Sequence, residues 1–188
     1  MAKHSLLTVD QAARCLHAGE IIAYPTEAVF GLGCDPRNEQ AVYRLLHLKN
    51  RPISAGLILI ADCYQRFEPY IAPVSAELRA VAMSCWPGPV TWLFPRADSV
   101  PHWLAGDHNT IALRLSAHPT CRELCAAFAG AIVSTSANPS CAEPARSAGR
   151  VEEYFGSYLG GIVSGALGGQ ERPSEIRDLA SGAVIRKN

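Results

Sequence analysis

Short apolar runs alternate with helix-like segments along this chain, and several gaps between the runs are too short for a crossover helix. Ile176 and Ala183–Ile185, which both have the composition of closing strands, are separated by only a few residues. Parallel neighbours in a sheet need a connection of about a dozen residues or more, so a purely parallel sheet does not fit these gaps. We therefore expect an α/β fold with a twisted mixed sheet and helices packed on it.

Helix signals fill the longer gaps between these runs. Thr8, followed three residues later by glutamine, has the pattern of a capping box. Asn38 and Ser75 are predicted to cap two further helices. A fourth helix is predicted over Pro119–Phe128, with Gly130 closing it.

The composition is that of a globular protein with a well-buried core. Hydrophobic residues make up 48% of the 188 residues and charged residues 18%, so we expect a single domain over residues 1–188. Lysine plus arginine equals aspartate plus glutamate at 17 each, which gives no bulk signal for nucleic-acid binding. A local basic groove remains compatible with this balance, because net charge does not describe how charge is distributed.

The cysteine and hydropathy patterns point to a cytoplasmic location. The seven cysteines are an odd number, and no two of them have the CxxC spacing of a zinc or redox site. We therefore expect reduced thiols and no metal bound by protein side chains. No apolar run approaches the roughly 18 residues that a membrane span requires, and the N-terminus does not resemble a signal peptide.

The stretch Ser134-Thr135-Ser136-Ala137-Asn138 carries the strongest signal for a binding site. It follows the apolar run Ala131–Val133, so its hydroxyl and amide groups are expected to emerge where a buried strand ends. Ligands of α/β proteins bind at such strand ends. A turn rich in serine and threonine is the alternative interpretation.

A second candidate lies at Tyr24-Pro25-Thr26-Glu27. A strand is predicted to end at Pro25, which leaves Thr26 and Glu27 at its mouth. Gly31 and Gly33 then allow either unusual dihedral angles or a close approach of other groups. The alternative is an ordinary corner between a strand and a loop.

Lys49 and Arg51 form a third candidate, a pair of cations at a predicted helix end. The helix is expected to end near Asn50, because Arg51 precedes Pro52 and is thereby disfavoured from helical dihedrals. The two cations either satisfy the last helical carbonyl groups or clamp a phosphate. We expect Arg51 to be exposed at this helix end.

Arg114 interrupts the otherwise apolar strand Ile111–Leu115. A buried cation is costly without a partner, so a carboxylate from the protein or from a ligand is expected beside it. Trp86-Pro87-Gly88-Pro89 is interpreted as a rigid turn into the next strand. Ser174 and Arg186 are weaker candidates that could complete a ring of donors.

Together these segments resemble the YrdC/TsaC family of threonylcarbamoyl-AMP synthases, in its short bacterial form. The resemblance rests on motifs that occur in the family's order: Tyr24-Pro25-Thr26-Glu27 with Gly31-Leu32, Lys49-x-Arg51-Pro52, Trp86-Pro87-Gly88-Pro89-Val90-Thr91, Leu113-Arg114 with His118-Pro119, Ser134-Thr135-Ser136-Ala137-Asn138-x-Ser140, and Pro173-Ser174-x-Ile176-x-Asp178.

The chain departs from the family pattern at three places, one of which is Glu175, where many relatives have threonine. Cys141 stands where relatives commonly have glycine, which brings the turn after Ser140 into question. The segment Ile53–Gly56 lacks a lysine that many relatives carry shortly after the Arg-Pro pair.

The resemblance implies a fold with a large concave cleft and a defined reaction. L-threonine, bicarbonate or carbon dioxide, and ATP would give threonylcarbamoyl-adenylate and pyrophosphate. Magnesium would be bound mainly through the ATP phosphates. Partner machinery would then transfer the carbamoyl group to the tRNA adenosine next to the anticodon.

The resemblance also implies a role for each candidate residue. Lys49 and Arg51 would act on the triphosphate as the catalytic cations. The threonine or its carbamate would be held by Thr26, Arg114, Ser134 and Ser174. The ATP side would be formed by Lys49, Arg51, Ser136, Asn138, Ser140 and Arg186.

Two other functions fit parts of the pattern. A non-catalytic module that binds double-stranded RNA or tRNA could use a basic cleft, although the neutral charge balance predicts only weak RNA binding. A carbamoyl-transfer protein of the hydrogenase-maturation type would carry an acylphosphatase-like segment and zinc-finger cysteines, and neither pattern occurs in this sequence.

Overall fold

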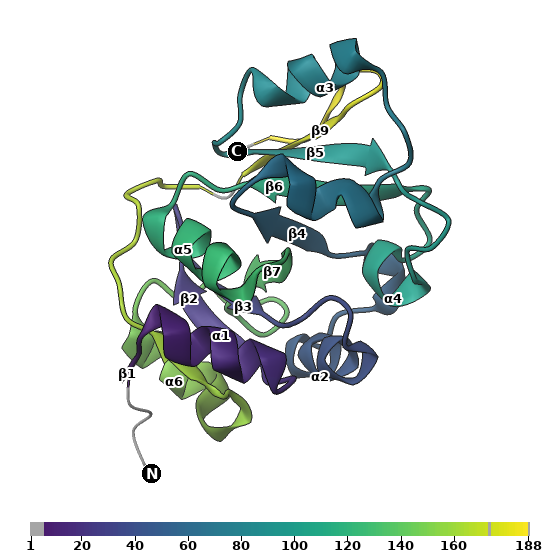
Figure 1. Ribbon diagram of the computed structural model, residues 1–188. Helices are drawn as coiled ribbons and strands as arrows, with labels where there is room; N and C mark the ends of the chain where they lie inside the picture. The colour runs from purple at the N-terminus through teal and green to yellow at the C-terminus, as the bar shows by residue number, and fades with distance from the viewer. Residues whose placement is uncertain (1–5, 173, 188) are drawn as a thin grey trace.

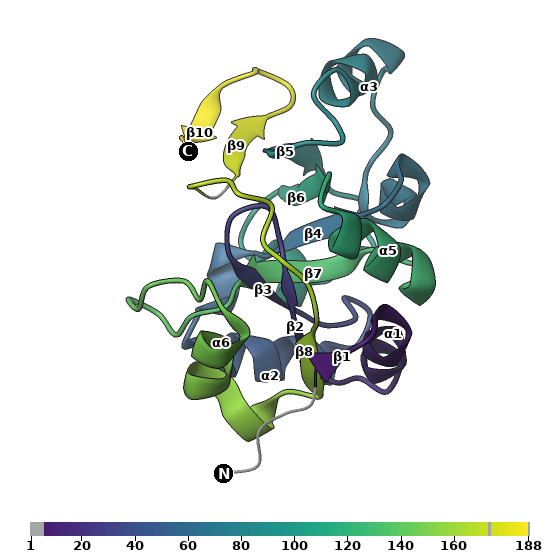
Figure 2. The same cartoon turned by 90° about the vertical axis from the view of Figure 1, so that its left-hand side faces the viewer.

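A mixed β-sheet runs through the molecule, with helices on both of its faces (Figures 1 and 2). The computed structural model describes residues 6–172 and 174–187. Its ten strands lie in the order β1-β8-β2-β3-β7-β4-β6-β5-β9-β10. The strands are β1 (Leu6–Leu7), β2 (Ile22–Pro25), β3 (Phe30–Gly33), β4 (Ile58–Ala61), β5 (Val90–Pro95), β6 (Thr110–Leu115), β7 (Ile132–Ser136), β8 (Gly161–Val163), β9 (Glu175–Asp178) and β10 (Val184–Arg186).

Six α-helices and three short 3₁₀ helices connect the strands in the described residues. They are α1 (Val9–His17), α2 (Glu39–Lys49), η1 (Ile53–Ala55), η2 (Tyr64–Tyr70), α3 (Ala76–Met83), α4 (His102–Ala105), α5 (Pro119–Phe128), α6 (Ala148–Phe155) and η3 (Gly156–Tyr158). Across residues 6–172 and 174–187, every helix is too short or too polar to cross a membrane.

The sheet contains both parallel and antiparallel pairs, which confirms the predicted mixed architecture. The central strand β7 pairs antiparallel with β3 on one side and with β4 on the other. Strand β4 in turn pairs parallel with β6. The closing strands β9 and β10 pair antiparallel, as their short separation requires.

Successive residues of the central strands bury their side chains on opposite faces of the sheet. Ile60 and Ile132 belong to an apolar cluster that α1 and α5 cover. Leu59 and Val133 belong to the larger cluster, which includes the apolar residues of α2 and α6. Both faces of the sheet centre are therefore buried, which explains the uninterrupted apolar runs in the sequence.

The predicted helix starts agree with the structure. The Thr8 side chain accepts a hydrogen bond from the Gln11 amide in a complete capping box. The side chains of Asn38 and Ser75 cap α2 and α3 by accepting from the amides of Ala41 and Leu78. Gly130 was wrong as the closing residue of α5, because Ala129 adopts the left-handed conformation there, with φ 57° and ψ 33°.

The structure corrects two boundaries near the candidate site. Gly31 and Gly33 lie in a strand, β3, that was not predicted. A Cβ atom on Gly33 would lie 2.6 Å from the carbonyl oxygen of Val133, so a close approach explains this glycine. Ser134 and Ser136 lie within β7, which extends past the apolar run that was predicted as the strand.

The left-handed conformation of Ala129 leads to a stability prediction. Such a conformation costs a residue with a Cβ atom about 1–2 kcal/mol, and glycine avoids most of that cost. Ala129→Gly should therefore raise the free energy of unfolding by about 0.5–1 kcal/mol, measured by denaturant titration. Ala126→Gly, in the interior of the same helix, is the matched control and should lower it by about 1 kcal/mol. Equal destabilisation by both changes would contradict this assignment.

Candidate active site

A cavity of about 180 Å³ opens where β3, β4, β6 and β7 meet the segment before β9. The residues that line this cavity come from chain segments that are far apart in the sequence. Its lining consists of Thr26, Glu27, Ala28, Val29, Phe30, Gly31, Arg51, Leu57, Ile58, Arg114, Ser134, Thr135, Ser136, Pro144, Gln170, Arg172, Ser174 and Arg186.

The strand register places Arg114 and Ser134 on the same face of the sheet. Arg114 of β6 lies opposite Ile60 of β4, and Ser134 of β7 lies opposite Ile58 of the same strand. Ile58 and Ile60 are two residues apart and therefore point to one face. The cation and the hydroxyl group thus flank β4 from both sides, on the face that α1 and α5 cover elsewhere.

The corner after β2 is held by the hydroxyl group of Thr26. Its Oγ1 atom donates to the carbonyl oxygen of Val29 at 2.7 Å, and the Thr26 amide donates to the same oxygen at 3.1 Å. The segment that follows β8 binds the outer side of this corner, since Gly168 N–H donates to Thr26 and Gln170 N–H to Glu27. Thr26 therefore keeps acceptor lone pairs for a ligand while its proton maintains the turn.

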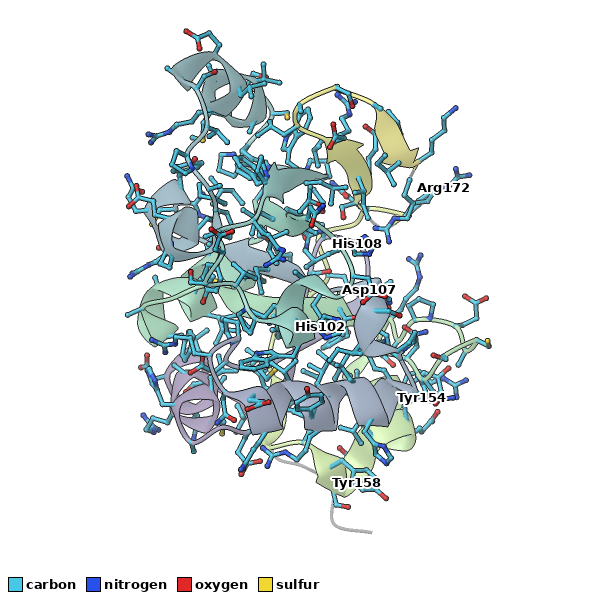
Figure 3. The ribbon with its side chains drawn as sticks, turned by 90° about the vertical axis from the view of Figure 1, so that its right-hand side faces the viewer. His102, Asp107, His108, Tyr154, Tyr158 and Arg172 are labelled. Carbon is cyan, nitrogen blue, oxygen red and sulfur yellow. The ribbon has the colours of Figure 1, made fainter. Side chains whose placement is uncertain are left out.

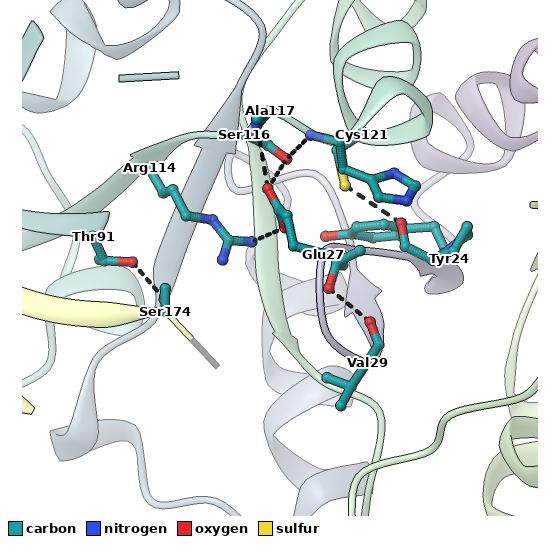
Figure 4. Close-up of polar contacts among 12 residues, drawn as sticks. Tyr24, Glu27, Val29, Thr91, Arg114, Ser116, Ala117, Cys121 and Ser174 are labelled. Carbon is teal, nitrogen blue, oxygen red and sulfur yellow. Dashed lines mark hydrogen bonds and ion pairs between the residues drawn. The ribbon is translucent and has the colours of Figure 1, made fainter. Parts of the chain in front are cut away.

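Arg114 has a partner from the protein itself, which answers the alternative that the sequence left open. Its NH2 group lies 3.4 Å from Oε2 of Glu27, and both side chains are buried (Figure 4). The other oxygen of Glu27 accepts from Ser116 Oγ at 2.7 Å and from the Ala117 amide at 3.2 Å. Burial alone would raise the pKa of Glu27, but Arg114 and Ser116 outweigh it and hold that pKa below the ordinary value. The carboxylate is therefore ionised at neutral pH.

Ser174 and Arg186 line the cavity from the C-terminal part of the chain. The Ser174 hydroxyl lies 2.9 Å from the Thr91 hydroxyl. The backbone carbonyl oxygen of Ser174 accepts a hydrogen bond from Arg186 NH2 at 2.7 Å. Burial, and then the charges of Arg114 and Arg51, lower the pKa of Arg186. Buried Thr91 thus holds the Ser174 hydroxyl in place. The sequence predicted only a rigid turn before Thr91 and no contact with Ser174.

Arg51 reaches the cavity, whereas Lys49 lies behind its wall. The guanidinium group of Arg51 donates to the carbonyl oxygen of Gly56 at 2.9 Å, so this residue is half-buried and not exposed as expected. The ammonium group of Lys49 is buried and donates to the carbonyl oxygens of Ser136 and Asn138. Burial and the neighbouring charge of Arg51 lower the pKa of Lys49 from 10.5 to about 8.

Asn138 and Ser140 shape the loop after β7 and do not line the cavity. The amide nitrogen of Asn138 donates to the carbonyl oxygens of Pro139 and Ala142, at 2.9 and 2.8 Å. The Ser140 hydroxyl donates to the carbonyl oxygen of Lys49 at 2.7 Å. Cys141 has a left-handed φ of 66°, so it adopts a conformation that glycine would favour at this position.

Four arginines line the cavity, and sequence reasoning found three of them. The fourth is Arg172, which lies just before β9 on the side shown in Figure 3. Its position two residues before Ser174, beside the Pro-Ser motif, is the signal that could have found it. Glu27 is the only acidic residue among the described residues of the lining. The cavity is therefore strongly cationic, as the binding of an anionic ligand requires.

The structure brings seven of the predicted site residues into one cavity, while Lys49, Asn138 and Ser140 support its wall from behind. The seven lining residues are Thr26, Arg51, Arg114, Ser134, Ser136, Ser174 and Arg186.

Comparison with known proteins shows the family to which this arrangement belongs. The sequence profile of the Sua5/YciO/YrdC family, which carries the description "Telomere recombination", matches residues 14–188. The chain belongs to the Sua5/YciO/YrdC family. The resemblance inferred from the sequence motifs is thereby confirmed.

Two bacterial members of the Sua5/YciO/YrdC family are similar to the chain over nearly its full length. The threonylcarbamoyl-AMP synthase of Halorhodospira halophila is 52% identical over 95% of this chain and 94% of that protein. The threonylcarbamoyl-AMP synthase of Pseudomonas putida KT2440 is 53% identical, over 97% of this chain and 98% of that protein.

A solved structure of the same family shares the fold. The crystal structure of P. abyssi Sua5 complexed with L-threonine superposes with a TM-score of 0.88 at 30% sequence identity. The match covers 95% of this chain but 53% of the Sua5 chain, so this chain spans about half the length of that relative.

The lowered pKa of Lys49 predicts a pH-dependent stability. An unfolded lysine titrates near 10.5 and folded Lys49 near 8, so between these pH values the unfolded chain binds more protons. The contribution of Lys49 to the free energy of unfolding should therefore rise with pH, by at most about 1.4 kcal/mol per pH unit. Denaturant titrations from pH 7 to pH 10 should show wild type gaining stability relative to Lys49→Met.

The control for this measurement is Lys187→Met, which removes an exposed lysine and should give a curve parallel to wild type. Parallel curves for wild type and Lys49→Met would show that Lys49 titrates normally.

Proposed function

We propose that this cavity makes threonylcarbamoyl-AMP and pyrophosphate from L-threonine, ATP and bicarbonate or carbon dioxide. This is the activity of relatives that are 52–53% identical over nearly the whole chain, and it is the activity that the sequence motifs predict. The observation that carries the proposal is that arginines and serine hydroxyls face one cavity. Such a site can hold an amino acid and a nucleotide at the same time.

Threonine would occupy the end of the cavity that contains Arg114. The guanidinium group suits the threonine carboxylate, because its planar donors match the two carboxylate oxygens. Ser134, Ser174 and Thr26 offer hydroxyl oxygens around it that can accept from the amine or the threonine hydroxyl. The complex of P. abyssi Sua5 with L-threonine supports a threonine site in this fold.

ATP would be bound by Arg51 and Arg186. These guanidinium groups would hold the triphosphate, and Ser136 would face the adenylate side. Lys49 would add its charge from behind the wall, since its ammonium group has a third N–H beyond the two that bind carbonyl groups. Asn138 and Ser140 would act on the same side by fixing the loop after β7.

The reaction needs positioning and charge stabilisation more than a nucleophilic side chain. The threonine amine would capture carbon dioxide, and an oxygen of the resulting carbamate would attack the α-phosphorus of ATP as pyrophosphate leaves. Fixed cations at the triphosphate would stabilise the charge that develops on the phosphate oxygens. Holding all three reactants in one cavity would supply the remaining acceleration.

The residues fit a magnesium ion that is bound through the phosphates. In the described part of the chain, no group of three His, Cys, Asp or Glu side chains is placed to hold a metal ion. Glu27, the one carboxylate of the described lining, is already occupied by Ser116, Ala117 and Arg114. When bound, magnesium would supply neutralisation of phosphate charge.

We infer a cytoplasmic setting from the cysteines. All seven cysteines are free thiols, which supports the cytoplasm, where thiols stay reduced. The product would pass to the machinery that modifies tRNA next to the anticodon.

Residues 1–188 would act as one domain around the common sheet. Any binding of RNA by the protein itself would be weak, because the net charge is zero.

The direct test is to incubate purified protein with ATP, threonine and labelled bicarbonate, and to identify the product by mass spectrometry. We expect labelled threonylcarbamoyl-AMP together with an equal amount of pyrophosphate. Steeply salt-dependent RNA binding without any ATP turnover would instead support the RNA-binding module.

Arg51→Ala should abolish most of the synthesis while the protein remains folded. The loss of a phosphate-binding cation in the transition state corresponds to about a 10²- to 10³-fold fall in kcat. Arg150→Ala, which removes an exposed arginine of α6 outside the cavity, is the matched control and should leave kcat unchanged. Near-normal turnover of Arg51→Ala would remove this residue from the triphosphate site.

Ser134→Ala should raise the KM for threonine more than the KM for ATP. Ser134 is buried and lines the cavity, across β4 from Arg114, and the loss of one hydrogen bond to a substrate costs about 0.5–1.5 kcal/mol. Steady-state kinetics with each substrate varied in turn measures the difference. An unchanged KM for threonine would place Ser134 outside its site.

A further inference from the structure

Arg114 differs in its partner from two other arginines of the cavity, Arg51 and Arg186. Glu27 lies 3.4 Å from its guanidinium group, and the two side chains are only 8% and 11% exposed. Arg51 and Arg186 instead donate to the neutral carbonyl oxygens of Gly56 and Ser174. Within residues 6–172 and 174–187, no carboxylate lies within ion-pair distance of Arg51 or Arg186.

Glu27 is fixed so firmly that it acts through Arg114 and not on a ligand. Ser116 and Ala117 hold its Oε1 atom, which leaves Oε2 facing the guanidinium group (Figure 4). The Oε2 atom is closed off from solvent and has no hydrogen-bond donor among the described residues. Arg114 Nε is likewise buried without an acceptor. The carboxylate therefore sets both the position and the charge balance of Arg114.

This difference makes Arg114 unlike Arg51 and Arg186 as a binding group. At Arg114, the charges of guanidinium and carboxylate cancel, so a ligand is held mainly by the geometry of its hydrogen bonds. Among the described residues, no carboxylate cancels the positive charge of Arg51 or Arg186. A polyanion therefore gains most at Arg51 and Arg186, and Glu27 repels it from Arg114.

We propose that Glu27 is a positioning residue that reserves Arg114 for a substrate carboxylate of single negative charge and keeps phosphate groups away from Arg114. The inference rests on the proposed function, because it names how the same cavity assigns the amino acid and the triphosphate to different arginines. The ionised state of Glu27, which Arg114 and Ser116 favour, supports this role.

The test measures the binding of threonine and of inorganic pyrophosphate by calorimetry, each alone and in the presence of the other. In wild type, pyrophosphate should leave the Kd of threonine unchanged. In Glu27→Gln, pyrophosphate should bind about tenfold more tightly and compete with threonine, since one buried negative charge has been removed. Glu27→Asp keeps the charge and should not show the competition. Unchanged pyrophosphate binding in Glu27→Gln, or equal competition in both variants, would overturn the proposal.

A second variant keeps the test decisive if Glu27→Gln fails to fold. Ser116→Ala removes the hydrogen bond that anchors Glu27 but keeps its charge, so the Kd of threonine should rise about tenfold while that of pyrophosphate stays the same. Equal weakening of both ligands would overturn the proposal. Glu153→Gln, at an exposed Arg–Glu pair outside the cavity, is the matched control and should alter neither affinity.

These measurements distinguish a failure of the proposed function from a failure of the role proposed for Glu27. Because they need no turnover, wild type that binds threonine but makes no threonylcarbamoyl-AMP would remove the proposed function alone. Wild type that makes the product, with Glu27→Gln unchanged in its pyrophosphate binding, would remove only the role of Glu27.

Discussion

The buried ammonium group of Lys49 ties the end of α2 to the end of β7. It donates to the carbonyl oxygens of Ser136 and Asn138, and Ser140 returns a hydrogen bond to the carbonyl oxygen of Lys49 itself. This closed set of contacts fixes the distance between the helix that precedes Arg51 and the strand that carries the serines. The cationic wall and the hydroxyl wall of the cavity therefore keep one arrangement relative to each other.

The sheet supplies the second constraint. Strand β7 lies between β3 and β4 with antiparallel partners on both sides, so a slip by one residue would turn Ser134 and Ser136 to the opposite face. The apolar residues Ile132 and Val133, buried on opposite faces, prevent such a slip. The same burial that stabilises the core thus determines which hydroxyl groups face the ligand.

The sequence predicted most of this fold and part of the site, for identifiable physical reasons. Capping residues such as Thr8 and Asn38 act locally, so their helices were placed correctly. The strand at Gly31–Gly33 was missed because its glycines lack β-propensity and are required by contacts with β2 and β7. Non-local contacts of this kind are invisible in one sequence.

The site shows the same division between local and non-local information. The need of Arg114 for a carboxylate follows from burial alone, whereas the identity of Glu27 as that partner follows from the packing of β6 against the corner after β2. The sequence predicted that Lys49 and Arg51 lie at the end of a helix. It did not predict that the ammonium group of Lys49 points into the protein and the guanidinium group of Arg51 into the cavity. Their environments differ through tertiary contacts, which spacing along the chain does not encode.

A crystal structure with threonine and a non-hydrolysable ATP analogue bound together would show which arginines bind which substrate. We expect the threonine carboxylate at Arg114 and Ser134, the triphosphate at Arg51 and Arg186, and the α-phosphorus beside the threonine nitrogen. A triphosphate bound at Arg114, or a nucleotide bound outside this cavity, would contradict this expectation.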